Sequence, residues 1–168
     1  MKESILNGKR ILAVDDEPDV LEVLGEEILG VCPNCQFEKA THYEIADEKL
    51  RTQLYDAVIL DIMGVRGFDL LKLSVSRNFS VAMLTAHALF PEALKRSIEM
   101  GARAYLPKEK IGEIVPFLEA IFKYANLFGW ERLFENLGEF FNTRWGEDWW
   151  ASEIQFWRGY GIKGPLPK

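Results

Sequence analysis

The sequence carries no excess of basic charge and no long apolar run. Its 20 lysine and arginine residues are outnumbered by 26 aspartate and glutamate residues, giving a net charge of −6 at pH 7. Because proteins that bind DNA or RNA neutralise phosphates with basic side chains, we expect no nucleic-acid partner. No stretch is long and apolar enough to span a bilayer, and the N-terminal MKESILNGKR lacks the apolar core of a signal peptide. We therefore expect a cytoplasmic protein without membrane contact.

Cysteine and histidine are also scarce. The two cysteines, Cys32 and Cys35, form a single CPNC motif, and the two histidines are His42 and His87. A structural zinc site needs four such ligands, and a redox-active C-x-x-C motif needs a thioredoxin-like setting that this sequence lacks. The pattern favours two reduced cysteines in a turn at Pro33–Asn34, and a thiol redox protein stays open as an alternative.

Short apolar segments alternate with segments of helical periodicity from Lys9 to about Asn126. The segments expected to form strands are 10–15, 36–41, 56–61, 80–85 and 104–107. The segments expected to form helices are one that begins at Pro18, then 43–53, 67–77, 91–100 and 111–125. Strands and helices in alternation are typical of parallel βαβ units, so the sequence predicts an α/β fold with a doubly wound five-stranded parallel sheet.

The expected strands end in polar side chains. These are Asp15, Asp16 and Glu17 after the first strand, Asp61 in the third, Thr85 in the fourth and Lys108 after the fifth. In a doubly wound sheet the carboxyl ends of the strands carry the functional site, so we expect these side chains to converge. Clustered carboxylates repel one another, and Mg²⁺ takes oxygen ligands. The sequence therefore predicts a magnesium site at this edge of the sheet.

Four motifs, in this order, resemble the receiver domain of two-component response regulators, a family with a flavodoxin-like fold. They are ILAVDDEPDV, YDAVILDIMGVRGFDLL, VAMLTAHA and GARAYLPK, and the resemblance covers about residues 8–126. It implies that a histidine kinase or phosphotransfer protein passes a phosphoryl group to Asp61. It also implies that Mg²⁺ is bound directly by Asp16, Asp61 and the backbone carbonyl of Met63, with Asp15 assisting through water.

The resemblance implies roles for three further residues in the phosphorylated state. The Lys108 ammonium would neutralise phosphoryl charge, and the Thr85 hydroxyl would donate a hydrogen bond to the phosphoryl group. Tyr105 matches the aromatic residue that swings inward when Thr85 moves. Because a receiver accepts the phosphoryl group on its own side chain, we expect no enzyme beyond self-phosphorylation and slow autodephosphorylation.

Two departures from the family pattern separate this sequence from its relatives. The loop after Asp61, DIMGVRGFD, is about two residues shorter than usual and has no proline, and Gly64 and Gly67 are expected to give its backbone the freedom to close. The family's lysine is usually followed by a cis proline, whereas Lys108 is followed by Glu109. A phosphorylation-independent scaffold with the receiver fold therefore stays open as an alternative.

The composition changes after about residue 126, so we expect a receiver domain at 1–126 and an aromatic helical extension with a loose tail at 127–168. All five tryptophans lie beyond residue 129. Helical spacing predicts one helix with Trp130, Phe134, Leu137 and Phe141 on one face, a turn at 142–146, and a second helix at 147–158 with Trp150, Ile154 and Trp157 on one face. Such an extension either covers the receiver or provides a surface for an output protein or a second copy.

Overall fold

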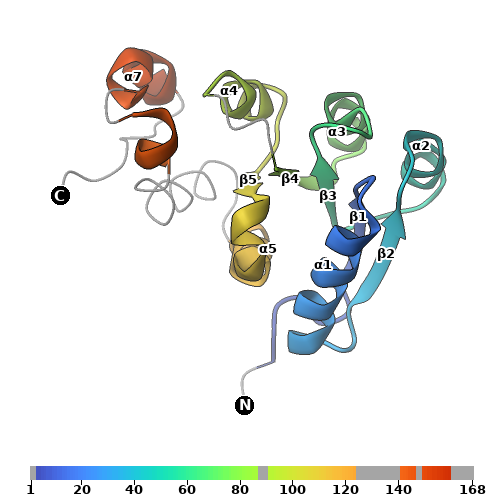
Figure 1. Cartoon of the computed structure of the whole chain (residues 1–168). Coiled ribbons are helices and arrows are strands. Elements are labelled where there is room, and N and C mark those ends of the chain that lie inside the picture. Colours follow the sequence, from blue (N-terminus) through green and yellow to red (C-terminus); the bar gives the residue numbers. More distant parts are fainter. Residues whose placement is uncertain (1–2, 87–90, 124–140, 147–148, 160–168) are drawn as a thin grey trace.

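The computed structural model describes residues 3–86, 91–123, 141–146 and 149–159, with the backbone alone at 150–154. Five parallel strands form one sheet in the order β2-β1-β3-β4-β5 (Figure 1). Their bounds are β1 Arg10–Val14, β2 Gln36–Ala40, β3 Ala57–Asp61, β4 Ser80–Thr85 and β5 Ala104–Pro107. The order reverses direction at β1 and β3, so the predicted doubly wound sheet is confirmed.

Helices cover both faces of the sheet. They are α1 Pro18–Val31, α2 Tyr43–Thr52, α3 Gly67–Ser76, α4 Pro91–Glu99 and α5 Ile114–Lys123. Helix α1 contacts α5 on one face, and α2, α3 and α4 lie on the other (Figure 1). None of the helices within the described ranges is long and apolar enough to cross a membrane.

The apolar pattern of the sequence explains these elements. Every residue of β3 is buried, as expected for a central strand of a parallel sheet that is covered on both faces. Pro18 is the first residue of α1, where its fixed φ favours a helix start, and Leu21, Leu24 and Ile28 form the buried stripe. The hydrophobic core therefore holds the strand ends in fixed positions.

The segment after β5 differs from the prediction of one helix at 111–125. A 3₁₀ helix, η1, spans Lys108–Glu113, with non-helical dihedral angles at Lys110, and α5 begins only at Ile114. Gly112, which has a low helix propensity, explains why the regular helix starts late. The predicted end of this helix and the predicted domain boundary at 126–127 lie outside the described residues.

In the extension, the predicted turn at 142–146 is wrong for the described residues. Residues 141–145 are helical, and the chain turns at Gly146, whose φ of +85° suits glycine. Phe141 and Trp145 stack with ring centroids 4.8 Å apart, a contact that four-residue spacing on a helix allows. Helix α7 follows at Trp149–Gly159, close to the predicted second helix. Trp130, Phe134, Leu137 and the side chains of Trp150 and Ile154 lie outside the described residues.

The described part of the extension contacts the receiver at several points, among them the following. The Phe141 ring packs edge-to-face on Tyr105 of β5, with centroids 6.4 Å apart. The Arg144 guanidinium forms an ion pair with Glu109 of η1. The Lys95 ammonium of α4 lies 4.8 Å from the centre of the Phe156 ring of α7, and Figure 1 shows α7 beside α4. The extension therefore lies against the side of the receiver formed by α4, β5 and η1.

The two cysteines are buried and form no disulfide. The Cys35 thiol donates a hydrogen bond to the Lys9 carbonyl, and burial together with the neighbouring Cys32 raises the pKa of Cys35 to about 11. Because the thiolate is the reactive form, a thiol of this kind is poorly suited to redox exchange. The geometry therefore favours the interpretation of two reduced structural cysteines.

Candidate functional site

Three carboxylates meet at the carboxyl edge of the sheet. Asp61 is the last residue of β3, and Asp15 follows β1 directly, with its backbone N–H donating to the Ala40 carbonyl of β2. One carboxylate oxygen from each of Asp15, Asp16 and Asp61 lies within 4.8 Å of the others. The predicted convergence of these acids is thus present in the structure. Their positions are set by two buried neighbouring strands.

The cluster combines buried and exposed acids. Asp15 and Asp61 are almost fully buried, whereas Asp16 faces solvent. Burial, reinforced by the charge of Asp15, raises the pKa of Asp61 to about 7. Burial also raises the pKa of Asp15 despite its hydrogen bond to Lys108. Ionised carboxylates are therefore costly here, and a bound cation would offset that cost.

Lys108 places one ammonium group among the acids. Its Nζ lies 2.8 Å from Asp15, 3.0 Å from Glu17 and 3.5 Å from Asp61. Burial opposes the charge of Lys108, but the hydrogen bonds to Asp15 and Glu17 outweigh it and raise the pKa to about 12. The side chain is thus a permanent cation at neutral pH. Glu17, grouped with the clustered acids in the sequence, is exposed and pairs with Lys108.

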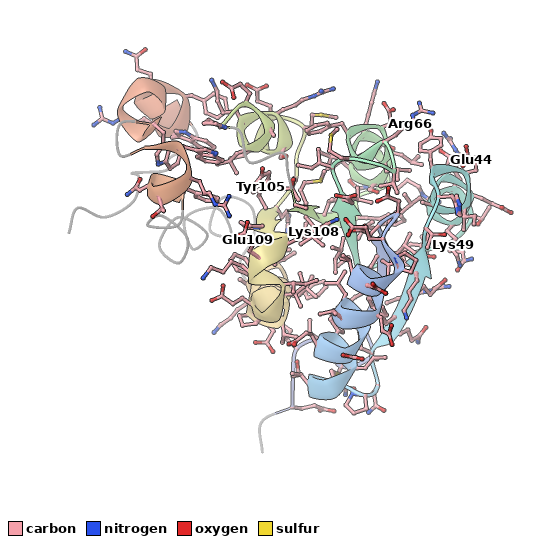
Figure 2. All side chains as sticks on the ribbon, viewed as in Figure 1. Glu44, Lys49, Arg66, Tyr105, Lys108 and Glu109 are labelled. Carbon is pink, nitrogen blue, oxygen red and sulfur yellow. The ribbon has the colours of Figure 1, made fainter. Side chains whose placement is uncertain are left out.

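Thr85 and Tyr105 lie on the two strands at the far side of the site. Thr85 ends β4, is buried, and faces Pro107 of β5 in the strand register. Tyr105 is fully buried in β5, and burial raises the pKa of its hydroxyl well above the usual range. Its ring is thus in an inward position, packed against Phe141 of the extension. Figure 2 shows Tyr105, Lys108 and Glu109 near one another where β5 continues into η1.

Two glycines allow the short loop after Asp61 to close. Gly64 has a φ of +83°, and a Cβ atom there would lie 2.4 Å from a carboxylate oxygen of Asp16. A Cβ atom on Gly67 would lie 2.1 Å from the backbone oxygen of Asp61. Arg66, between them, also adopts the left-handed conformation, with a φ of +55°. The expected freedom at Gly64 is a positive φ, whereas at Gly67 it is room for a close backbone approach.

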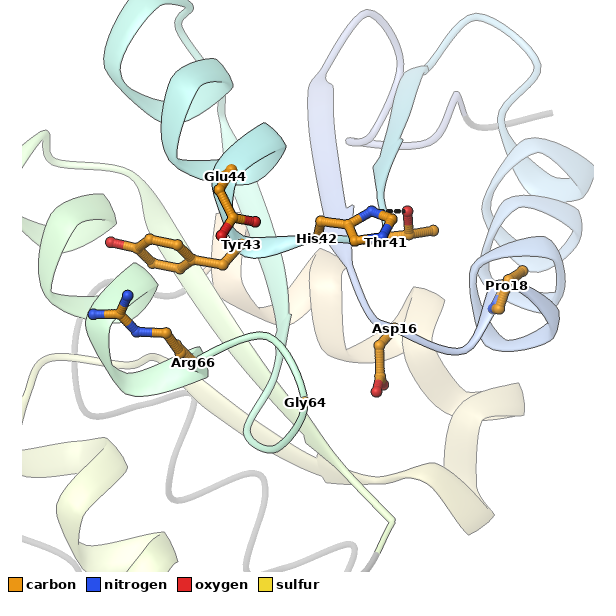
Figure 3. A pocket seen from close by; sticks show the side chains of 8 residues that line it. All are labelled: Asp16, Pro18, Thr41, His42, Tyr43, Glu44, Gly64 and Arg66. Carbon is orange, nitrogen blue, oxygen red and sulfur yellow. Dashed lines mark hydrogen bonds between the residues drawn. The ribbon is translucent and has the colours of Figure 1, made fainter.

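Two cavities open at this edge. The smaller, about 140 Å³, lies over the acids and is bordered by Asp61, Met63 and Lys108. This volume is enough for several water molecules or a hydrated ion. The larger, about 440 Å³, lies beside Asp16 and is bordered by His42, Tyr43 and Arg66 (Figure 3). No local pattern in the sequence indicates this second cavity, because its lining comes from three segments that are distant in the chain.

The donor set fits a hard divalent cation. Asp15, Asp16 and Asp61 together supply the oxygen ligands that Mg²⁺ takes, and Asp16 and Asp61 border the open cavity, which leaves room for retained water. Within the described residues, the acidic cluster contains no histidine or cysteine that would favour zinc. The site can therefore neutralise charge that develops close to the Asp61 carboxylate.

The chain is similar to known proteins in its sequence and in its fold. The curated Arabidopsis thaliana protein named two-component response regulator ARR18 is 36% identical over 107 residues, which is 60% of this chain and 16% of that protein. This chain thus spans about one sixth of the length of that relative. A solved response regulator receiver domain protein (CheY-like) from Methanospirillum hungatei JF-1 is 26% identical, with a TM-score of 0.54, over 64% of this chain and 94% of that one.

A response regulator structure from Thermotoga maritima has a TM-score of 0.61 at 18% identity, over 69% of this chain and 98% of that one. At this identity the likeness shows the fold alone. The sequence also matches the family described as response regulator receiver domain, over residues 11–118. Because that match runs from β1 into α5 and takes in more than half of the chain, the chain belongs to the family of response regulator receiver domains.

Proposed function

We propose that the chain is a cytoplasmic response regulator whose Asp61 accepts a phosphoryl group from a histidine kinase or phosphotransfer protein. The observation that carries this proposal is the position of Asp61, fixed at the end of a buried strand between two further carboxylates and the Lys108 ammonium. A fixed carboxylate suits in-line attack on phosphorus. An Asp61 oxygen forms the new O–P bond as the N–P bond of the donor phosphohistidine breaks.

The residues around Asp61 would bind the metal ion, neutralise phosphoryl charge and respond to phosphorylation. Asp16, Asp61 and the Met63 carbonyl would hold Mg²⁺, with Asp15 acting through water, and the bound ion would supply positive charge to the phosphoryl oxygens. Lys108 supplies the protein's own positive charge at the same cavity. Thr85 would donate its hydroxyl to the phosphoryl group, and Tyr105 would report that change to the α4 and β5 side of the receiver.

The direct test is intact mass after incubation with acetyl phosphate and Mg²⁺. We expect the full chain to gain the mass of one phosphoryl group, and to gain none when EDTA replaces Mg²⁺. A chain that binds Mg²⁺ but gains no mass with acetyl phosphate or a phosphorylated histidine donor would instead be a receiver-fold scaffold.

Magnesium should stabilise the fold through the acidic cluster. At a Mg²⁺ concentration about ten times the dissociation constant, binding to the native state alone adds about 1.4 kcal/mol, or a rise in Tm of about 3–6 °C. Thermal melts with and without Mg²⁺ measure this rise. It should nearly vanish in Asp16→Asn and persist in Glu26→Gln, which removes an exposed acid of α1. Equal rises in wild type and Asp16→Asn would contradict the assigned site.

We further propose that the phosphorylated chain signals through protein contacts, with the receiver at 1–126 and the extension at 127–168 as its two parts. The described extension contains two short helical segments and no separate core that could house an enzyme. Its contacts with Lys95 of α4, Tyr105 of β5 and Glu109 of η1 support this proposal. An output protein or a second copy of the chain would bind there, and no nucleic-acid or membrane partner is proposed.

A further inference from the structure

The extension holds the residues on both sides of Lys108. Phe141 packs on Tyr105, three residues before Lys108, and Arg144 pairs with Glu109, the next residue after it. Both contacts come from one helical segment at 141–145. The segment 105–109, which carries the Lys108 ammonium group, is therefore contacted on both sides of Lys108 by residues that are distant in the sequence.

From this arrangement we infer that Phe141 and Arg144 are positioning residues for Lys108, so that the extension tunes phosphoryl binding at Asp61. The inference rests on the proposed function, because it concerns the same site. It adds a role for the extension within its own chain, where it influences the phosphorylation site, in addition to any contact with an output partner.

The position of the Lys108 ammonium group depends on the backbone around it. Its Nζ lies 2.8 Å from Asp15, 3.0 Å from Glu17 and 3.5 Å from Asp61. A small displacement of the ammonium group therefore changes which of these acids it pairs with. Of these three distances, the one to the phosphoryl acceptor is the longest. The Lys108 side chain is only 10% exposed, so it has little room to compensate when its backbone shifts.

The backbone that follows Lys108 is a weak restraint. It is a 3₁₀ helix that is interrupted at Lys110, and 3₁₀ hydrogen bonds have poorer geometry than α-helical ones. At the position where the resembling family usually has a proline, this chain has Glu109, and Glu109 is the residue that Arg144 binds. The ion pair between Arg144 and Glu109 thus restrains the backbone at the position where other members of the family have a rigid proline.

The contact of Phe141 with Tyr105 is more firmly held than the ion pair of Arg144 with Glu109. Phe141 and Tyr105 are both fully buried, and Trp145 and Trp149 pack on Phe141. The Trp149 indole donates a 2.7 Å hydrogen bond to Asn142, which joins the two helical segments of the extension. Because Phe141 is fixed by this aromatic cluster, Tyr105 and the end of β5 are restrained along with it.

The test measures the affinity of the full chain for beryllofluoride, a phosphoryl mimic, in the presence of Mg²⁺, by titration calorimetry. Arg144 and Glu109 are 45% and 47% exposed, and ion pairs of such exposure are weak. We therefore expect Arg144→Ala to weaken beryllofluoride binding by about two- to fivefold. The matched control, Arg158→Ala, removes an exposed arginine of α7 and should leave the affinity unchanged.

Two further variants separate positioning from simple loss of packing. Phe141→Ala should weaken binding by about tenfold or more, and Phe141→Leu should recover part of it. The paired reversal Glu109→Arg with Arg144→Glu should restore the affinity that either single change lowers, because it restores the ion pair with the charges exchanged. A static cover would change the melting temperature in these variants without changing beryllofluoride affinity.

The deciding measurement repeats Arg144→Ala in a Lys108→Ala background. If the extension acts through Lys108, the loss caused by Arg144→Ala disappears there, since the group being positioned is gone. An unchanged affinity in Arg144→Ala, or an equal loss with and without Lys108, overturns the inference while leaving the proposed function standing. Wild-type protein that fails to bind beryllofluoride with Mg²⁺ overturns both.

Discussion

Asp61→Asn will accept no phosphoryl group from acetyl phosphate or from a phosphorylated histidine donor, whereas the wild-type chain will be labelled on one residue. The amide has almost the same shape as the carboxylate but lacks the anionic oxygen that attacks phosphorus. Asp15 and Asp16 are not expected to substitute, because Asp15 is held by Lys108 at 2.8 Å and both are assigned to the metal. The expected effect is all or none, read by intact mass.

A matched control lies at the opposite end of the same strand. Asp56 precedes β3, is exposed, and accepts a 2.8 Å hydrogen bond from the Arg10 backbone N–H, a bond that an asparagine oxygen can keep. Asp56→Asn should therefore be labelled like wild type. Labelling that survives in Asp61→Asn, or that disappears in Asp56→Asn, would show that the acceptor has been misassigned.

Gly67→Ala will destabilise the protein and disturb the site together. A Cβ atom there would lie 2.1 Å from the Asp61 carbonyl oxygen and 2.8 Å from the Ile62 Cα, both backbone atoms that no side-chain rotation can clear. Forced backbone shifts of this kind cost about 2–4 kcal/mol. Because the obstacle belongs to Asp61 itself, we expect acetyl phosphate labelling of the folded variant to slow by an order of magnitude or more.

Gly30→Ala is the control for this substitution. Gly30 lies in α1, and a Cβ atom there would meet nothing within 4 Å, so alanine should be neutral or slightly stabilising through its higher helix propensity. Chemical denaturation of the two variants measures the difference. A Gly67→Ala protein as stable and as quickly labelled as Gly30→Ala would mean that the loop closes differently from the structure.

The strands and the acidic edge of the sheet follow from local patterns in the sequence. Short apolar runs that end in Asp15 and Asp61 identify both the buried strands and their charged ends. They can be recognised because buried strands are apolar in sequence and the residues that follow them are polar. The prediction that Lys108 would reach the same edge depended on the parallel topology, which brings every strand end to one side. The strands and their charged ends are readable because each depends on residues close together in the chain, and the parallel topology then brings the distant ends to one edge.

Other features depend on pairings that a sequence does not encode locally. Glu17 counts as a third clustered acid in the sequence, yet its partner is Lys108, 91 residues away. Arg66 adopts a left-handed conformation that nothing in its side chain favours, because the short loop between two glycines leaves it no other path. The sequence predicts a turn at 142–146, where Asn142, Thr143 and Gly146 favour one, but residues 141–145 form a helix in which Phe141 stacks on Trp145.

The confinement of every tryptophan to the region beyond residue 129 divides the molecule optically. The sheet and its acidic edge contain no indole, so tryptophan emission comes from the extension alone. Trp145 and Trp149 touch the ring that packs on Tyr105, whereas the ion site lies at the ends of β1 and β3. An emission change on addition of Mg²⁺ and beryllofluoride to the unmodified protein would therefore report coupling between the two parts, with no label introduced into either.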